Sequence, residues 1–519
     1  MSLVRNFATV GVATIASRIL GFGRDILLAA LLGAGPVAEA YVAAFRLPNL
    51  FRRILAEGAL NAAFVPVYGG VLERSGDQEA ARFAGQVIGA LALILALLTA
   101  LALILMPWVI YVQVPGFAAD TEKFDLTVSM ATIMFPYLAL MSMLALLSGI
   151  LNSHRRFAAA AFAPALLNVV LIGVLAWLWF DGATASAQTG RIIAYAVIAG
   201  GIAQLLLAIT AIWRARIAIR LGWPRWSDES RKLVKLMVPG ILAGGITQLN
   251  IFIGTIIASA AAGAVSYLYF ADRLYQLPLG VIGIAVGVVL LPELSRNLQA
   301  SDEAAAEHSF ATAMRFSLAL TLPAAVALAV IPGPIVNVLF AHGAFTEADA
   351  AATANAVAAF AIGLPAFVLI KVFSPAYFAR QDTRTPMIFA AVGMVLNVVL
   401  AYLLFPYWQH VGIAVATSAA GWANAALLFI GLRGQRVFQL SNATYRALAL
   451  ILCSALLMGG VLVFLETATR HWTTAPDLWT QIGGLAFLVM MGAGVYALLC
   501  QYFGILSMRS LSDALRRKP

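Results

Sequence analysis

Long apolar runs separated by short polar segments occupy almost the whole chain. Runs of about 20 apolar residues have the length that a helix needs to cross hydrocarbon. The two-residue alternation that is typical of a membrane barrel is absent. The pattern predicts an all-α polytopic membrane protein with about fourteen transmembrane helices. The predicted spans are residues 7–33, 37–68, 84–111, 124–151, 158–180, 191–213, 235–262, 266–294, 308–331, 349–378, 386–405, 410–432, 445–466 and 479–503.

Composition supports this class and excludes an ordinary soluble protein. Of 519 residues, 62% are hydrophobic and only 11% are charged, and the mean hydropathy is +0.93. The N-terminus is interpreted as a retained helix rather than a cleaved signal peptide, because Arg18 and Arg24 interrupt its apolar region. Cys453 and Cys500 both lie in apolar runs, so neither a disulfide nor a metal framework is expected.

The distribution of basic residues predicts the orientation. With the N-terminus placed in the cytoplasm, 22 of the 33 Lys and Arg residues fall on the inner side of the predicted spans. Only Lys123, Arg191 and Arg470 fall on the outer side. By the positive-inside rule, both termini are predicted to be cytoplasmic. The net charge of +10 is then explained by membrane topology, and no nucleic-acid partner is expected.

A short motif occurs in both halves of the chain. Leu167-Asn-Val-Val-Leu171 recurs identically as Leu396-Asn-Val-Val-Leu400, at an offset of 229 residues. A second match is offset by 226 residues and pairs Tyr41 with Tyr267 and Pro66 with Pro292. One such match could arise by chance in an apolar chain, but two at nearly equal offsets favour an internal duplication.

The duplication predicts three parts. Two parallel six-helix lobes cover residues 1–225 and 226–440, and residues 441–519 add two further helices and a basic tail. The connector Arg214–Lys235 contains Trp223-Pro-Arg-Trp226 and is interpreted as an interfacial linker, with Trp at headgroup depth.

Residues 17–66 carry an unusual number of charges for two neighbouring apolar spans. An ionisable side chain at bilayer depth costs roughly 2.5 to 3.5 kcal/mol on insertion scales, so such groups face a cavity, a partner or a substrate. Because the excess is basic, the substrate is expected to be anionic. The charged residues are Arg18, Arg24, Asp25, Glu39, Arg46, Arg52, Arg53 and Glu57.

Spacing gives two competing interpretations of these charges. Arg18 and Asp25 share a helix face, and Asn49, Arg53 and Glu57 form a ladder at four-residue intervals. In the structural interpretation, the ion pairs are Arg18–Asp25, Arg53–Glu57 and Asp272–Arg273. That interpretation leaves Arg24 and Arg52 without an obvious local partner. In the substrate interpretation, several guanidinium groups converge on a pyrophosphate, which their planar forks suit.

Signals of an enzyme are missing from the sequence. The chain has no Walker motif, its five histidines are scattered, and no Gly-x-Ser-x-Gly elbow occurs. We therefore predict a transporter that is not an enzyme and has no cofactor.

Three segments resemble one family, the MurJ (MviN) lipid II flippases of the multidrug/oligosaccharidyl-lipid/polysaccharide exporter superfamily. They are Ser17-Arg-Ile-Leu-Gly-Phe-Gly-Arg-Asp25, Ala44-Phe-Arg-Leu-Pro-Asn-Leu-Phe-Arg-Arg-Ile-Leu-Ala-Glu-Gly58 and Ala271-Asp-Arg-Leu-Tyr-Gln-Leu-Pro278. The resemblance implies transfer of undecaprenyl-pyrophosphate-linked muropeptide from the inner to the outer leaflet of the bacterial cytoplasmic membrane, by alternating access.

The resemblance also implies which residues act. Arg18, Arg24, Arg52 and Arg273 match the cavity arginines of the family, and Glu39 keeps an acidic position. The full predicted substrate-binding set is Ser17, Arg18, Arg24, Asp25, Glu39, Asn49, Arg52, Arg53, Glu57 and Arg273. Gln276 stands where some relatives carry Glu, so a salt bridge made by that Glu cannot form here.

A sodium site is a further implication. Asn397 and Thr417 resemble two of its ligands in some members, but Ala401 stands where such a site would place an acid. The expected energy source is the membrane potential or a monovalent cation. Expected partners are lipid II, membrane lipids and cell-wall synthesis proteins, and the chain is expected to be a monomer.

Other functions remain open from the residues alone. Export of another polyprenyl-pyrophosphate glycan fits the charges equally well. A cation-coupled drug exporter should carry an excess of intramembrane acids, and a membrane glycosyltransferase or lipid phosphatase should carry a metal-binding carboxylate pair or a catalytic His. A purely structural scaffold does not account for the cost of so many intramembrane charges.

Overall fold

The computed structural model describes residues 3–54, 60–300, 302–434 and 440–505. Within these ranges every regular element is helical, which confirms the predicted all-α fold class. Nine helices of the described part are long and apolar enough to cross a membrane. The total of about fourteen spans stays a prediction.

The chain forms two compact units. Unit 1 comprises Met1–Ser266 together with Gly343–Phe345, and unit 2 comprises Tyr267–His342 and Thr346–Pro519. The helix Asp228–Ala258, which begins just after the predicted lobe boundary at residue 225, packs against helices of unit 1. The division into lobes at residues 225 and 440 stays a prediction.

Unit 1 contains nine α-helices and one short 3-10 turn, Pro115–Ala119, among its described residues. The helices are α1 (Leu3–Leu32), α2 (Pro36–Phe51), α3 (Asn61–Ile104), α4 (Met106–Gln113), α5 (Thr121–Met134), α6 (Tyr137–Ser153), α7 (Ala158–Phe180), α8 (Ala187–Arg214) and α9 (Asp228–Ala258).

Unit 2 contains α10 to α16, although the first three residues of α10 belong to unit 1. The helices are α10 (Ala264–Gln299), α11 (Glu303–Val330), α12 (Pro332–Phe340), α13 (Glu347–Phe378), α14 (Arg384–Gly434), α15 (Asn442–Thr473) and α16 (Leu478–Tyr502).

The predicted spans correspond to helices whose ends differ in detail. The span 158–180 coincides with α7. The span 124–151 is divided between α5 and α6 by a turn at Phe135 and Pro136, since proline supplies no N–H to continue the helix. The spans 386–405 and 410–432 both lie in α14, where Gln409 has φ +46° and interrupts the helical backbone.

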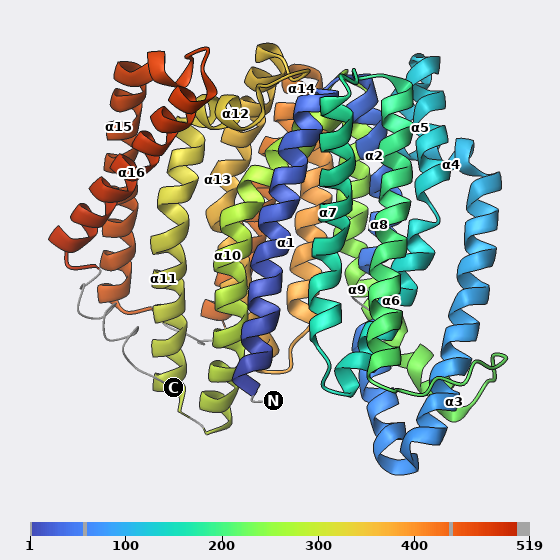
Figure 1. Ribbon diagram of the computed structural model, residues 1–519. Coiled ribbons are helices and arrows are strands. Elements are labelled where there is room, and N and C mark those ends of the chain that lie inside the picture. The colour runs from blue at the N-terminus through green and yellow to red at the C-terminus, as the bar shows by residue number, and fades with distance from the viewer. Residues whose placement is uncertain (1–2, 55–59, 301, 435–439, 506–519) are drawn as a thin grey trace. The chain divides into compact units, whose positions relative to one another are not determined.

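Small residues let the helices of each unit approach closely. In unit 1, α1 packs along α7, and α7 packs along α8 (Figure 1). A Cβ added to Gly200 of α8 would lie 2.5 Å from the Leu167 side chain. In unit 2, a Cβ on Gly363 of α13 would lie 2.5 Å from Ser418 Oγ of α14. Without a hydrophobic driving force in lipid, such close contact is what holds helices together.

Three residues of the α12–α13 connector, Gly343–Phe345, dock on the C-terminal end of α1. The Ala344 N–H donates to the Ala30 carbonyl at 2.7 Å, and Phe345 is buried. Gly33 makes room for this contact with φ +65°, and a Cβ there would lie 2.5 Å from the Ala344 carbonyl oxygen. Both the backbone conformation and the space therefore require glycine at position 33.

We expect Gly33→Ala to destabilise the protein by about 1–3 kcal/mol, because it combines a left-handed non-glycine residue with a backbone clash. Gly35→Ala is the matched control, since Gly35 has φ −74° and nothing within 4 Å of its added Cβ. Thermal unfolding of the two purified variants in detergent measures the difference. Equal midpoints would show that the docked connector adds no stability.

Candidate functional site

Arg24 of α1 lies in a buried polar cluster in unit 1. Its Nε and Nη2 atoms donate to Asp25 Oδ1 at 3.0 Å and 2.7 Å. Its Nη1 donates to Asn168 Oδ1 of α7 at 3.0 Å. Arg24 is 8% exposed and Asp25 is 2% exposed. The carboxylate and the amide oxygen thus share one guanidinium, which lowers the cost of holding its charge among apolar helices.

Asn168 also joins the two helices through its amide nitrogen. Its Nδ2 donates to the Ser17 carbonyl at 3.0 Å. Gly21 allows this approach, because a Cβ there would lie 3.3 Å from that nitrogen. Asn168 therefore contacts α1 at two turns and orients Arg24 relative to Ser17.

The structural interpretation paired Asp25 with Arg18, and the structure does not contain that pair. Asp25 forms its ion pair with the adjacent Arg24 at 2.7 Å rather than with Arg18. Residues at i and i+1 do not face each other on a helix, which favoured Arg18 on spacing grounds. The long Arg24 side chain reaches back to its neighbour, and the prediction that Arg24 lacks a local partner is overturned with it. Arg18 is exposed, and Ser17 is half-buried.

The C-terminal end of α2 carries Asn49, Arg52 and Arg53 of the predicted substrate-binding set. Arg52 Nε donates to Asn49 Oδ1 at 2.8 Å, so Arg52 also has a local partner, contrary to the prediction. Residues 52–54 form a wider, π-type helical turn, and Arg53 is half-buried there. The predicted ladder from Asn49 through Arg53 to Glu57 stays a prediction, because Glu57 lies outside the described residues.

Arg46, which lies nearer the start of α2 than Arg52, forms a hydrogen bond with another helix of unit 1. Its Nη1 donates to Thr255 Oγ1 of α9, and the Thr255 hydroxyl donates to the Ile251 carbonyl. This interaction links α2 to α9 across 209 residues of sequence. The spacing of residues within α2 gave no indication of it.

Glu39 takes part in a buried ion pair in the first turn of α2. Lys123 Nζ of α5 donates to Glu39 Oε2 at 2.8 Å, with the two side chains 8% and 1% exposed. The Val265 N–H donates to Glu39 Oε1 at 3.3 Å, and the Lys123 ammonium lies 3.9 Å from the centre of the Phe117 ring. Lys123 was counted among the loop charges of the outer side, whereas the structure places it in the interior of unit 1. The role predicted for Glu39 in substrate binding stays a prediction.

In unit 2, Arg273 of α10 lies over an aromatic ring. Its guanidinium carbon is 4.7 Å from the centre of the Tyr269 ring, a cation–π distance. The neighbouring Asp272 accepts a hydrogen bond from Gln276 Nε2 one turn later. Gln276 thus donates its amide N–H to a carboxylate on the same helix.

The repeated motif places an asparagine in a polar contact in each unit. In unit 1, Asn168 receives the bond from Arg24, as described above. In unit 2, Asn397 of α14 is buried, and its Oδ1 lies 3.3 Å from Thr417 Oγ1. Ala401, one turn further, is buried. No group of three or more His, Cys, Asp or Glu side chains that could hold a metal occurs in the part of the chain that the structure describes.

Comparison with solved structures identifies the class of protein. An inward-facing multidrug resistance MATE family transporter of the MOP superfamily matches with a TM-score of 0.68 at 15% identity, over 81% of this chain and 94% of that one. At that identity the match shows the fold alone. A structure described as lipid II flippase MurJ, inward closed conformation, matches with a TM-score of 0.79 at 25% identity, over 95% of this chain and 98% of that one. The chain therefore shares its fold with both of these proteins.

The family follows from the sequence comparisons. The family model described as "Lipid II flippase MurJ" matches residues 28–482. The "Probable lipid II flippase MurJ" of Rhizobium meliloti (strain 1021) is 45% identical, and that of Rhizobium tropici is 43% identical. Each alignment covers 100% of this chain and 97% of the relative. The chain belongs to the MurJ family, a family of transporters and not of enzymes, and it is a multi-pass protein of the inner membrane.

We expect Asn168→Leu to cost about 1–3 kcal/mol of stability, because it leaves a buried guanidinium nitrogen without its amide acceptor. Gln204→Leu is the control: Gln204 is a buried amide of α8 whose Nε2 donates to the neutral Ala163 carbonyl at 2.8 Å. Its loss should be smaller, since bonds to charged groups contribute more. Unfolding in detergent ranks the two variants, and a larger loss for Gln204→Leu would contradict the role given to Asn168.

A double-mutant cycle tests the Glu39–Lys123 pair. Lys123→Met and Glu39→Gln should each cost about 3–5 kcal/mol, because each leaves a buried group without its partner. The double variant should cost clearly less than the sum. The matched control is Arg82–Glu79, whose 2.7 Å separation is close to the 2.8 Å of the buried pair but whose side chains are 54% and 51% exposed, so the coupling should be at most about 1 kcal/mol. Additive losses at Glu39 and Lys123 would rule out the coupling.

Proposed function

We propose that this protein moves lipid II, the undecaprenyl-pyrophosphate-linked muropeptide, from the inner to the outer leaflet of the bacterial cytoplasmic membrane. The observation that carries the proposal is the identity of 43–45% over the whole chain to relatives named as probable lipid II flippases. The same alignments cover 97% of each relative, so no large part of those proteins lacks a counterpart here.

The pyrophosphate is bound by arginine. The proposed ligands are Arg18, Arg24, Arg52, Arg53 and Arg273. Arg18 is exposed and carries a permanent charge, whereas Arg24 is already bonded to Asp25 and Asn168. A phosphate oxygen that binds Arg24 beside Asp25 shares the guanidinium with the carboxylate, so Asp25 keeps its positive partner.

Binding and release are coupled to alternating access. The pair of Arg24 with Asp25 gives the empty site a satisfied state, so the protein does not need substrate to compensate that charge. Asn168 keeps the guanidinium oriented when the phosphate binds beside Asp25. Binding therefore requires no rebuilding of the helix contacts between α1 and α7.

The membrane potential supplies the driving force. With both termini in the cytoplasm, export moves the negatively charged headgroup outward, toward the positive side of the membrane. An inside-negative potential assists this movement by roughly 2.3 kcal/mol per charge per 100 mV. The protein acts as a monomer and holds no cofactor. Asn397 and Thr417 provide neutral oxygens only, which supports transport without a tightly bound cation.

Depletion of the protein in its native bacterium tests the substrate. Radiolabelled lipid II should accumulate in a pool that an externally added lipid II-cleaving colicin cannot reach, because the pyrophosphate headgroup stays in the inner leaflet. Normal cleavage together with intact peptidoglycan synthesis would contradict the proposal. Accumulation of a different polyprenyl-pyrophosphate glycan would instead assign that substrate.

Complementation of the depleted cells with variants tests the arginines. We expect Arg18→Ala and Arg273→Ala to lower the externally cleavable pool by at least about tenfold, since a charged hydrogen bond to phosphate contributes roughly 1.5–3 kcal/mol. Arg191→Ala is the control, because Arg191 is an exposed basic residue in the first turn of α8. Variants that insert normally and restore the full pool would remove these arginines from the site.

A further inference from the structure

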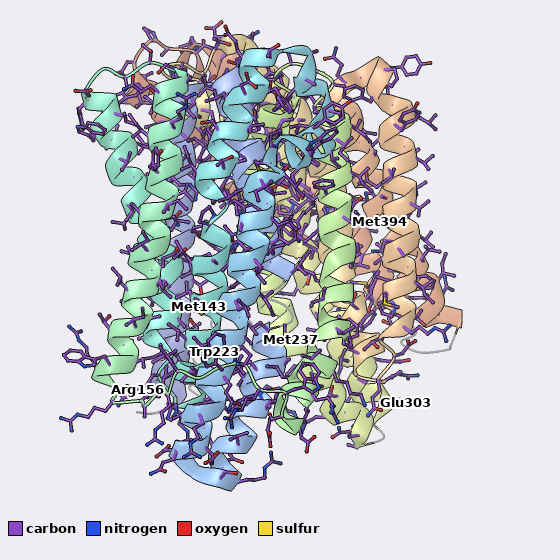
Figure 2. The ribbon with its side chains drawn as sticks, turned by 90° about the vertical axis from the view of Figure 1, so that its right-hand side faces the viewer. Met143, Arg156, Trp223, Met237, Glu303 and Met394 are labelled. Atoms are coloured by element: carbon purple, nitrogen blue, oxygen red, sulfur yellow. The ribbon has the colours of Figure 1, made fainter. Side chains whose placement is uncertain are left out.

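The segment that joins α8 to α9 in unit 1 crosses the surface of α3. Residues 215–227, called the strap below, form no helix beyond a turn at their start. The Arg220 N–H donates to the Ala81 carbonyl of α3 at 3.1 Å. Figure 1 shows this loop passing beside the lower part of α3, and Figure 2 labels Trp223 on it.

Two glycines of α3 hold the strap close to the helix. A Cβ on Gly85 would lie 1.7 Å from the Arg220 carbonyl oxygen, and one on Gly89 would lie 2.5 Å from the Gly222 carbonyl oxygen. These glycines are four residues apart and so lie on one face of α3. The path of the strap backbone over α3 is therefore defined by contact.

The side chains of the strap point mainly away from the protein. Ile217 and Ile219 are half-buried, whereas Arg216 and Arg220, which flank them, are exposed. Three large apolar side chains follow, with exposed fractions of 77% for Leu221, 84% for Trp223 and 69% for Trp226. Exposed tryptophans on a backbone held by contact indicate a surface that meets something other than water.

The position along α3 sets the depth of the strap. It crosses α3 between Ala81 and Gly89. At the N-terminal end of this crossing α3 exposes the charged pair Glu79 and Arg82. On the other side it exposes an apolar face that includes Leu93, Ile94, Leu97 and Leu101. The strap thus lies where a polar surface changes to a lipid-facing one, the depth at which tryptophan side chains are enriched.

Basic residues are concentrated in and around the strap. Between positions 214 and 235 the chain holds seven basic residues and two acidic ones, Asp228 and Glu229. Asp228 Oδ1 lies 3.9 Å from Arg231 Nη1, a long distance for an ion pair. The basic residues are Arg214, Arg216, Arg220, Arg225, Arg231, Lys232 and Lys235, and all seven are exposed. Basic and aromatic side chains together at this depth suit anionic phospholipid headgroups.

We propose that the strap is a binding surface for anionic phospholipids at the membrane interface. Trp223 and Trp226 insert beside the headgroups, and Arg216, Arg220 and Arg225 bind lipid phosphates. Because Gly85 and Gly89 hold the strap against α3, lipid binding to the strap also fixes α3 at the interface. The strap leads directly into α9, so the start of α9 is fixed as well. The proposal goes beyond transport of lipid II and does not depend on it.

The test uses the full-length protein in vesicles, with a dye attached at position 223. A Trp223→Cys variant is made in a background with Cys453→Ala and Cys500→Ala. Quenching by neutral acrylamide is compared in phosphatidylcholine vesicles with and without phosphatidylglycerol. We expect phosphatidylglycerol to lower the quenching constant by about twofold, and the effect to vanish with Arg216→Ala, Arg220→Ala and Arg225→Ala combined. High salt should weaken it in the unmutated strap.

A dye at position 479, from Trp479→Cys, is the matched control. Trp479 is also strongly exposed, but residues 474–484 include no basic residue, so its quenching should not depend on phosphatidylglycerol. It also reports whether the triple arginine variant is folded. Equal quenching at position 223 in both lipids, or an effect that survives loss of the three arginines, would overturn the proposal. Shielding seen only in native membranes would point to a protein partner instead and equally overturn it.

Discussion

The burial of a guanidinium among apolar helices is the constraint on which the site in unit 1 depends. The Arg24 guanidinium is held by the carboxylate of the adjacent Asp25 and by the side-chain amide of Asn168 on another helix. The carboxylate compensates the charge, and the amide holds the direction of the side chain and bonds α1 a second time at Ser17. A carboxylate and a neutral amide together keep the buried guanidinium compensated and oriented before an anionic substrate arrives.

The five-residue motif that occurs twice in the chain places an asparagine against a different partner in each unit. Asn168 and Asn397 occupy the same place in an identical five-residue motif, and both are buried. In unit 1 the asparagine serves a charged guanidinium, and in unit 2 it contacts the Thr417 hydroxyl. The difference places a strong, charge-assisted contact in one unit and a neutral one in the other.

Charge outside the spans has a separate role. The exposed basic residues near the strap accompany tryptophans at the polar boundary of α3, whereas Lys123 and Glu39 form a pair within unit 1. A count of loop charges treats Lys123 and Arg220 alike. The structure separates them, because a basic side chain at a helix start can fold inward when a carboxylate of another helix is within reach.

Hydrophobic pattern alone determined the helical class, the extent of α7 and the placement of arginines in the first two apolar segments, because hydrocarbon admits few backbone solutions and penalises each charge. It also placed Trp223 at an interface by composition. It could not determine the partners. Arg24 meets Asn168 across 144 residues and Glu39 meets Lys123 across 84, and a bend of one long side chain decides between Arg18 and Arg24 at Asp25. Those choices depend on which helices lie side by side, and only the tertiary structure supplies that information.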